Sequence, residues 1–236
     1  MGNTLRSFSI FSIIKHRKKR HLRHNPYYLR ISKTIIKGLV LAFAAFFMVV
    51  LLLGGYAYAN LTANLPSLEQ LPVLLDRQNG LLLQPTRLYD RSGQNLLLTL
   101  DNPGFERHFL SVNPADAQHF SPLLIQTVIS LYEPDFWNSS GINWLHPLDP
   151  QANTLAERLV NSLLLDNEPA DFRHALRMKL LALQVTERFG KVQVLEWYLN
   201  SLYCGHYAYG MDNAARLYLG KSAADLNLSE SALLLA

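Results

Sequence analysis

Disulfides, metal-binding clusters and phosphate-binding loops are all missing from this 236-residue sequence. Its single cysteine, Cys204, cannot form an internal disulfide, and its apolar neighbours indicate a buried thiol. The five histidines after residue 60 show no metal-ligand spacing, so we predict no metal site. No glycine-rich phosphate loop and no nucleophile motif occurs either. The sequence therefore gives no support to a disulfide-stapled, zinc-binding or nucleotide-binding fold.

Acidic residues are absent from the first 37 positions, which hold ten Lys or Arg. The rest of the chain has twelve Lys or Arg against eighteen acids, so the overall net charge of +4 describes neither part. Basic arms bind nucleic acid in some proteins, but this arm leads directly into an apolar segment. We therefore interpret residues 1–37 as a basic cytoplasmic tail beside lipid headgroups, and we predict no nucleic-acid partner.

Charge is missing altogether from Gly38 to Ala59, a stretch of 22 residues. As a helix it would extend about 33 Å, enough for a bilayer core of about 30 Å. Buried helices of soluble proteins are rarely so long and uncharged. The apolar region of a cleavable signal peptide would be about 7–15 residues long and nearer the N-terminus. We predict one transmembrane helix over 38–59, with the N-terminus in the cytoplasm because Lys and Arg precede the span and acids follow it.

After this segment the sequence reads as a connector followed by an exported domain. Residues 60–84 form a connector punctuated by Leu and Pro, and residues 85–236 form the domain. A short β-hairpin with strands over 86–89 and 95–100 is predicted at its start, because two strand-like runs flank turn residues at 90–93.

The remainder of the domain is predicted to be helical. Gly190 is the expected C-terminal glycine of one helix, and Asn227 with Glu230 forms a capping box at the start of the last. From apolar spacing and caps we predict helices over 121–131, 153–165, 171–189, 191–201, 212–219 and from 227 onward.

The C-terminal region carries a specific set of motifs. It reads VQVLEWYLN over 192–200, GHYAYG over 205–210, YLGKS over 218–222 and LNLSESALL over 226–234. This set resembles the peptidoglycan glycosyltransferase family, the family 51 transglycosylases, whose patterns are roughly I-L-E-x-Y-L-N, G-x-x-A-Y-G, Y-F-G-K and L-x-L-x-E-A-A-L-L-A. The resemblance implies a mainly α, lysozyme-like domain, as in class A penicillin-binding proteins and monofunctional transglycosylases. Because the family continues beyond this helix, we expect further sequence after Ala236.

Members of this family polymerise glycan strands from lipid-linked disaccharide pyrophosphates. The reaction needs a general base for the acceptor hydroxyl and groups that hold the departing pyrophosphate, with a divalent metal in an active enzyme. The family's base is the Glu of an E-D-x-x-F-Y/W motif, whereas this chain has LYEPDFW over 131–137. The base position therefore falls on Tyr132, and a tyrosine with an ordinary pKa near 10 is a poor base at neutral pH.

Glu133 follows one residue after the base position, about 100° further round a helix. Two interpretations of this residue remain open. It is a displaced general base if the loop slips by one residue, or it is a solvated carboxylate beside a proline turn.

The second motif of the family, G-G-S-T-x-T-Q-Q-L-V-K-N, positions glycan and phosphates. It corresponds to QANTLAERLVNS over 151–162, which keeps Thr154 but loses both glycines, both glutamines and the lysine. Arg158 is a candidate to meet a phosphate. Alternatively, Glu157 and Arg158 form an exposed pair.

The third motif, R-K-x-x-E, corresponds to RHALR over 173–177. The resemblance makes Arg173 a candidate phosphate-binding residue, while the second glutamate has become Arg177. Glu196 and Asn200 match polar positions of the best-preserved motif. We include both as candidate ligand-binding residues, although we favour structural support over direct chemistry.

Three hypotheses account for this pattern. The leading one is a single-pass protein of the bacterial inner membrane whose periplasmic or extracellular domain binds lipid-linked precursor, glycan or a cell-wall synthesis protein without polymerising, and without a cofactor. The second is an active peptidoglycan glycosyltransferase with Glu133 as base, Arg158 and Arg173 on the pyrophosphate, and a divalent metal. The third is a decaying gene fragment whose exported part folds poorly.

Overall fold

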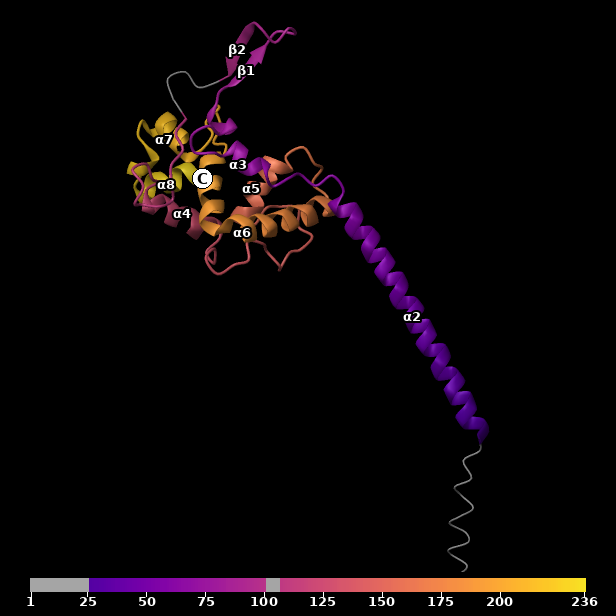
Figure 1. The fold of residues 1–236 in the computed structure, drawn as a ribbon. Coiled ribbons are helices and arrows are strands. Elements are labelled where there is room, and N and C mark those ends of the chain that lie inside the picture. The colour runs from indigo at the N-terminus through magenta and orange to yellow at the C-terminus, as the bar shows by residue number, and fades with distance from the viewer. Residues whose placement is uncertain (1–25, 101–106) are drawn as a thin grey trace, which may run out of the picture. The chain divides into compact units, whose positions relative to one another are not determined.

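A computed structural model describes residues 26–100 and 107–236 (Figure 1). Most of the predicted basic tail, residues 1–25, lies outside the described residues. The chain divides into two units, residues 1–60 and residues 61–236.

Helix α2, Pro26–Thr62, forms the described part of the first unit, and its last two residues belong to the second. Its part Ile35–Thr62 has 28 residues, a mean hydropathy of 2.7 in its most apolar window, and no burial of that window by protein. Apolar side chains along it, such as Leu41 at 72% exposure, lack protein neighbours that would remove them from water. The helix is therefore long and apolar enough to cross a membrane. It extends further than the predicted 38–59, since no proline interrupts it after Pro26.

The second unit is mainly helical with one short hairpin, which confirms the predicted fold class. Its elements are α3 (Gln70–Leu74), η1 (Leu81–Leu83), β1 (Thr86–Tyr89), β2 (Leu96–Leu100), α4 (Pro122–Tyr132), α5 (Leu155–Leu164), α6 (Phe172–Ser201), α7 (Met211–Leu219), η2 (Ala223–Asp225) and α8 (Leu228–Leu235).

The hairpin pairs β1 with β2 in antiparallel register, with Thr86 opposite Leu100. Its turn is closed by a hydrogen bond of 2.9 Å from the Gly93 N–H to the Asp90 carbonyl oxygen. Gly93 has φ +72°, a left-handed conformation that glycine adopts without a Cβ clash. The predicted strands and turn are confirmed.

Local sequence signals set most helix ends. Thr154 caps α5, and Asn227 with Glu230 forms the predicted capping box of α8. Helix α6 consists of two helical segments that meet at Gly190, where φ is 79° and ψ is 161°. The predicted break at Gly190 is therefore present, but it kinks one long element instead of separating two helices by a loop.

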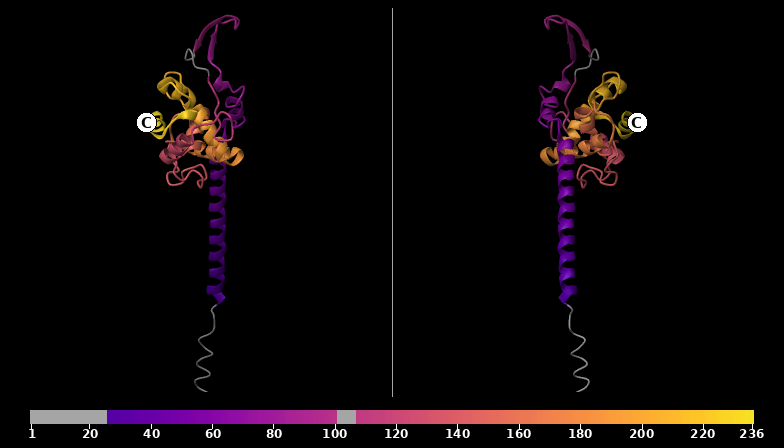
Figure 2. Two further views of the ribbon diagram at one scale, coloured as in Figure 1. Left: turned by 90° about the vertical axis from the view of Figure 1, so that its left-hand side faces the viewer. Right: turned by 90° about the vertical axis from the view of Figure 1, so that its right-hand side faces the viewer.

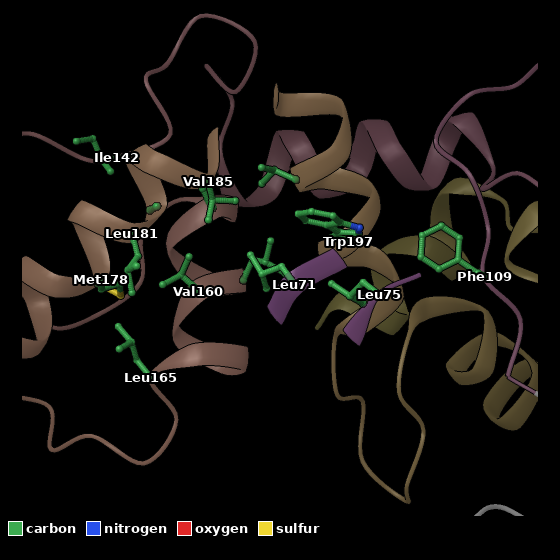
Figure 3. Close-up of a cluster of buried hydrophobic side chains, with 14 residues drawn as sticks. Leu71, Leu75, Phe109, Ile142, Val160, Leu165, Met178, Leu181, Val185 and Trp197 are labelled. Atoms are coloured by element: carbon green, nitrogen blue, oxygen red, sulfur yellow. The ribbon is translucent and has the colours of Figure 1, made fainter. Parts of the chain in front are cut away.

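Two buried clusters lie along α6. One packs α3 and α5 against α6, and Figure 3 shows its side chains converging between these helices. The other packs α4, α7 and η2 against the C-terminal end of α6, and the side views of Figure 2 show α4, α7 and α8 together beside that end. Leu159 and Leu195, one from each cluster, are fully buried. Truncating such a leucine to alanine costs about 2–5 kcal/mol.

Candidate functional site

The residue at the family's base position, Tyr132, lies at the last turn of α4 and is half-buried. Its hydroxyl donates a hydrogen bond of 2.8 Å to the carbonyl oxygen of Leu235 in α8. The guanidinium of Arg158 lies over its ring, 4.4 Å from the ring centroid. Cation–π contacts of this kind contribute about 0.5–2 kcal/mol. Arg158 has no carboxylate partner within the described residues.

A second tyrosine, Tyr198 of α6, completes this contact group. Its ring meets the Tyr132 ring edge-on, with centroids 6.4 Å apart. Burial raises the pKa of Tyr198 to about 12, and the neighbouring Tyr132 adds to the rise while Arg158 opposes it. The Tyr198 hydroxyl therefore stays protonated at neutral pH.

Glu133 is buried, with 6% exposure, so the interpretation as a solvated carboxylate is wrong. One carboxylate oxygen accepts a hydrogen bond of 2.5 Å from the Ser139 hydroxyl, and the other accepts one of 2.9 Å from the Leu155 N–H. Leu155 is the first residue of α5, where unpaired N–H groups stabilise a negative charge. Glu133 thus fastens the end of α4 to the start of α5. Its role as a general base stays a prediction.

Glu157 is fully buried, so an exposed pair with Arg158 is also wrong. Its carboxylate forms a salt bridge of 3.1 Å with the buried Lys179 Nζ and accepts N–H bonds from Asn143 and Asn153. The two neighbouring residues diverge because they lie about 100° apart on α5. Glu157 faces the interior beside α6, whereas Arg158 faces Tyr132.

Thr154, a predicted substrate-binding residue, is buried at the N-cap of α5. Its hydroxyl donates to the Gly141 carbonyl oxygen at 2.7 Å and accepts from the Glu157 N–H at 3.2 Å. These contacts give Thr154 a structural role, and binding of a ligand by its hydroxyl stays a prediction.

The third motif lies on the first turns of α6. Arg173 is half-buried, and the next residue, His174, forms a hydrogen bond of 2.8 Å between its Nε2 and the Asn161 side-chain oxygen of α5. Asn161 stands at the lysine position of the second motif, and His174 stands at the lysine position of the third. Two positions that are cationic in the family thus form one internal contact here.

Arg177 replaces the family's second glutamate and is only 4% exposed, so it does not lie on the helix surface. Its guanidinium donates to the carbonyl oxygens of Ala63 and Asn64 at 3.0 and 2.9 Å. It also forms a salt bridge of 3.0 Å with Glu168. A glutamate could not donate these hydrogen bonds. Arg177 therefore holds the segment that follows α2 against α6.

Glu196 and Asn200, the remaining predicted site residues, hold a different segment in place. Asn200 exchanges two hydrogen bonds with the backbone of Leu110, at 3.0 and 2.8 Å. Glu196 accepts from Ser111 Oγ and forms a salt bridge of 3.0 Å with Arg77. Both side chains are buried, and binding of a ligand by either one stays a prediction.

Sequence reasoning missed the partners of these residues. Arg77 lies 119 residues before Glu196, and Lys179 lies 22 residues after Glu157. No local pattern links residues so far apart. The only available signal is the presence of Lys179 within an otherwise apolar helical face, which indicates a buried cation with a partner.

The predicted positions therefore separate into three groups. Tyr132 and Arg158 come together, Glu133 accepts from the Leu155 N–H at the start of α5, and Glu196 with Asn200 contacts residues 110–112. A divalent cation does not fit the replaced positions, since hard cations need oxygen ligands and Tyr132, Arg158 and Arg177 carry no carboxylate. Within the described residues no three His, Cys, Asp or Glu side chains are grouped to hold a metal.

The chain belongs to the transglycosylase family, whose sequence pattern it matches over residues 106–236. Penicillin-binding protein 1A of Rickettsia bellii is 29% identical over 167 residues, which cover 64% of this chain and 20% of the relative. Penicillin-binding protein 2D of Bacillus subtilis is 27% identical over 206 residues, or 82% and 26%. Penicillin-binding protein 1A of Pseudomonas aeruginosa is 28% identical over 214 residues, or 85% and 23%. The chain thus spans about a quarter or less of the length of these relatives.

Proposed function

We propose that this chain is a membrane-anchored, cell-wall-associated transglycosylase domain that does not polymerise glycan. It binds lipid-linked peptidoglycan precursor, a glycan strand or a cell-wall synthesis protein. The observation that carries the proposal is that residues at the replaced motif positions contact one another. Arg158 covers the Tyr132 ring at 4.4 Å, and Asn161 pairs with His174 at 2.8 Å.

We expect no glycan polymerisation because the residues at the replaced positions do not provide a free general base. Glycosyl transfer needs a carboxylate placed to take the acceptor proton, and a general base must lie within hydrogen-bond reach of that proton. The Tyr132 hydroxyl donates a hydrogen bond to the Leu235 carbonyl oxygen, and Arg177 is cationic and buried. Both oxygens of Glu133 already accept hydrogen bonds from the protein.

The proposal includes the cellular location. The length and hydropathy of α2 support a membrane anchor, and the excess of Lys and Arg before it favours a cytoplasmic N-terminus. The domain then lies in the periplasm or outside the cell, at the inner membrane of a bacterium, where lipid-linked precursors are consumed. No cofactor is needed for binding alone.

One observation favours the second candidate function, an active glycosyltransferase. Glu133 accepts a hydrogen bond from Leu155 at the start of α5, and Arg158 belongs to the first turn of that helix, so a carboxylate and a guanidinium lie near one helix end. Glu133 would act as base after releasing Ser139, and Arg158 with Arg173 would hold the pyrophosphate. The family's divalent metal would need carboxylate ligands that Tyr132 and Arg177 do not supply.

The test is a polymerisation assay with labelled lipid-linked disaccharide and the detergent-solubilised full chain. The expected result is no polymer from protein that is folded and retains precursor bound in a filter or flotation assay. Glu133→Gln is assayed beside it, with Asp135→Asn as the matched control because Asp135 is an exposed carboxylate two residues away. If the wild type and Asp135→Asn make polymer and Glu133→Gln does not, the chain is an active glycosyltransferase with Glu133 as its base.

A further inference from the structure

A groove runs along the outer face of α4, on residues that belong to none of the three altered motif positions Tyr132, Arg158 and Arg177. Its volume is about 390 Å³, within the range of about 300–1,000 Å³ that is usual for small-molecule sites. The groove is lined by Val112, Pro114, Phe120, Pro122, Ile125, Gln126, Ile129, Ser130 and Trp137.

The lining contains no charged residue. A pyrophosphate would be desolvated there without a cation, so the groove favours a neutral ligand. Its floor is apolar, with Phe120 buried and Ile125 and Ile129 half-buried. Apolar floors of this kind bind the C–H faces and methyl groups of a ligand.

Two polar side chains, Gln126 and Ser130, lie one turn apart on the exposed face of α4. Neither side chain makes a hydrogen bond within the described part of the chain. The glutamine amide both donates and accepts, as does the serine hydroxyl. An acetamido group and ring hydroxyls present the same combination of donors and acceptors.

Trp137 forms one wall and is 52% exposed. Its ring is held by an edge-on contact with buried Phe136, with centroids 4.9 Å apart at an angle of 70°. Phe136 is in turn fixed by Lys191, which donates to its carbonyl oxygen at 2.6 Å. An exposed aromatic ring in a fixed orientation binds a flat ligand face at low entropic cost.

We propose that this groove binds the sugar rings of an N-acetylated glycan strand, with one ring stacked on Trp137 and its acetamido group at Gln126. The choice of a cell-wall glycan rests on the proposed function. The groove gives the domain a contact with glycan that does not require the replaced motif positions.

The experiment is a calorimetric titration of the detergent-solubilised full chain with the soluble hexamer of N-acetylglucosamine. Trp137→Ala is expected to weaken binding at least tenfold, and Gln126→Ala by about threefold. Trp144→Ala is the matched control, because Trp144 is 68% exposed and lies outside the groove, and it is expected to bind like the wild type. Tryptophan fluorescence of Trp144→Phe should still respond to the hexamer.

The groove assignment falls if the folded wild type does not bind the hexamer, or if Trp137→Ala binds it unchanged. It also falls if Trp137→Ala instead abolishes self-association in sedimentation, since the groove would then be an interface between copies. These outcomes are independent of the polymerisation assay. Polymer from the wild type would overturn the proposed function and leave binding through Trp137 measurable.

Discussion

The regions 132–177 and 191–236 of the same domain differ in how far they match the family's motifs. In the C-terminal region the polar residues Glu196 and Asn200 are kept, and both are buried and hydrogen-bonded to residues 110–112. In the earlier region Tyr132 and Arg177 replace carboxylates. Glu196 and Asn200 hold the fold, because removal of either side chain would leave buried polar groups unpaired.

Residues at the replaced positions of the region 132–177 nevertheless make defined contacts within the fold. Arg177 donates to two backbone carbonyls, and Glu157 pairs with Lys179 in the interior. Such contacts favour a well-packed domain over a decaying fragment that folds poorly. The comparison predicts that several replaced positions now matter as much for stability as the retained ones.

The largest expected effect is that of Glu157→Ala at a replaced position. It leaves Lys179 as an unpaired buried cation, and breaking a buried pair costs about 3–5 kcal/mol. Urea unfolding of the solubilised chain, followed by circular dichroism, measures the loss. Glu187→Ala, an exposed carboxylate on α6, is the control. A loss in the free energy of unfolding below about 1 kcal/mol would mean that the Glu157–Lys179 pair does not stabilise the fold.

The next effect is that of Arg177→Glu, which restores the family's residue. It removes both hydrogen bonds to the segment 63–64 and places a carboxylate beside Glu168. We expect about 3 kcal/mol of destabilisation, at the lower end for a buried pair because Glu168 is partly exposed. The unfolding midpoint measures this, and Gln184→Glu at an exposed position of α6 is the control. Increased stability, or polymer formation by Tyr132→Glu with Arg177→Glu, would show that the site is still intact.

A smaller effect is expected at a retained position. Asn200→Ala leaves the N–H and carbonyl of Leu110 without their partners, which costs about 1–3 kcal/mol. The same unfolding measurement detects it, and trypsin cleavage should increase near Arg107 because the segment that includes Leu110 is released. Asn227→Ala, which removes an exposed cap, should cost no more than about 1 kcal/mol. Equal losses in both variants would contradict a special role for Asn200.

The smallest effect is a dependence of stability on alkaline pH. Burial raises the pKa of Tyr198 to about 12 from 10.0 and that of the Cys204 thiol to about 11 from 9.0. The neutral forms are thus favoured in the fold, so their stabilisation is complete below pH 9 and is lost as pH rises from about 9 to 12. Urea midpoints measured over this range should fall. The decline should flatten in Tyr198→Phe with Cys204→Ala, and an identical decline in that variant would contradict the assignment.

Much of the fold could be predicted from local signals. The uncharged run identified the apolar helix, the turn residues at 90–93 identified the hairpin, and Asn227 with Glu230 identified a helix start. These features depend on residues close in sequence, where hydrophobic period, caps and turn chemistry act directly. The replacement of Glu by Tyr132 and Arg177 was equally visible.

The burial and the partners of the charged side chains could not be predicted from local signals. For both Glu133 and Glu157 a surface position was one of the open interpretations. Both are buried, since their partners Ser139, Leu155 and Lys179 come from other elements. A carboxylate enters the interior only when donors compensate its lost hydration, and packing alone decides whether those donors arrive.

Residue identity and spacing therefore determine the chain's family, its mainly helical architecture and its apolar helix. They also show that both carboxylates of the family's motifs are replaced. The pairing of Tyr132 with Arg158, the anchoring of residues 63–64 by Arg177, and the groove beside Trp137 exist only in the packed domain. The reason is physical: propensity and pattern act over a few residues, whereas burial and hydrogen-bond satisfaction depend on segments brought together from across the chain.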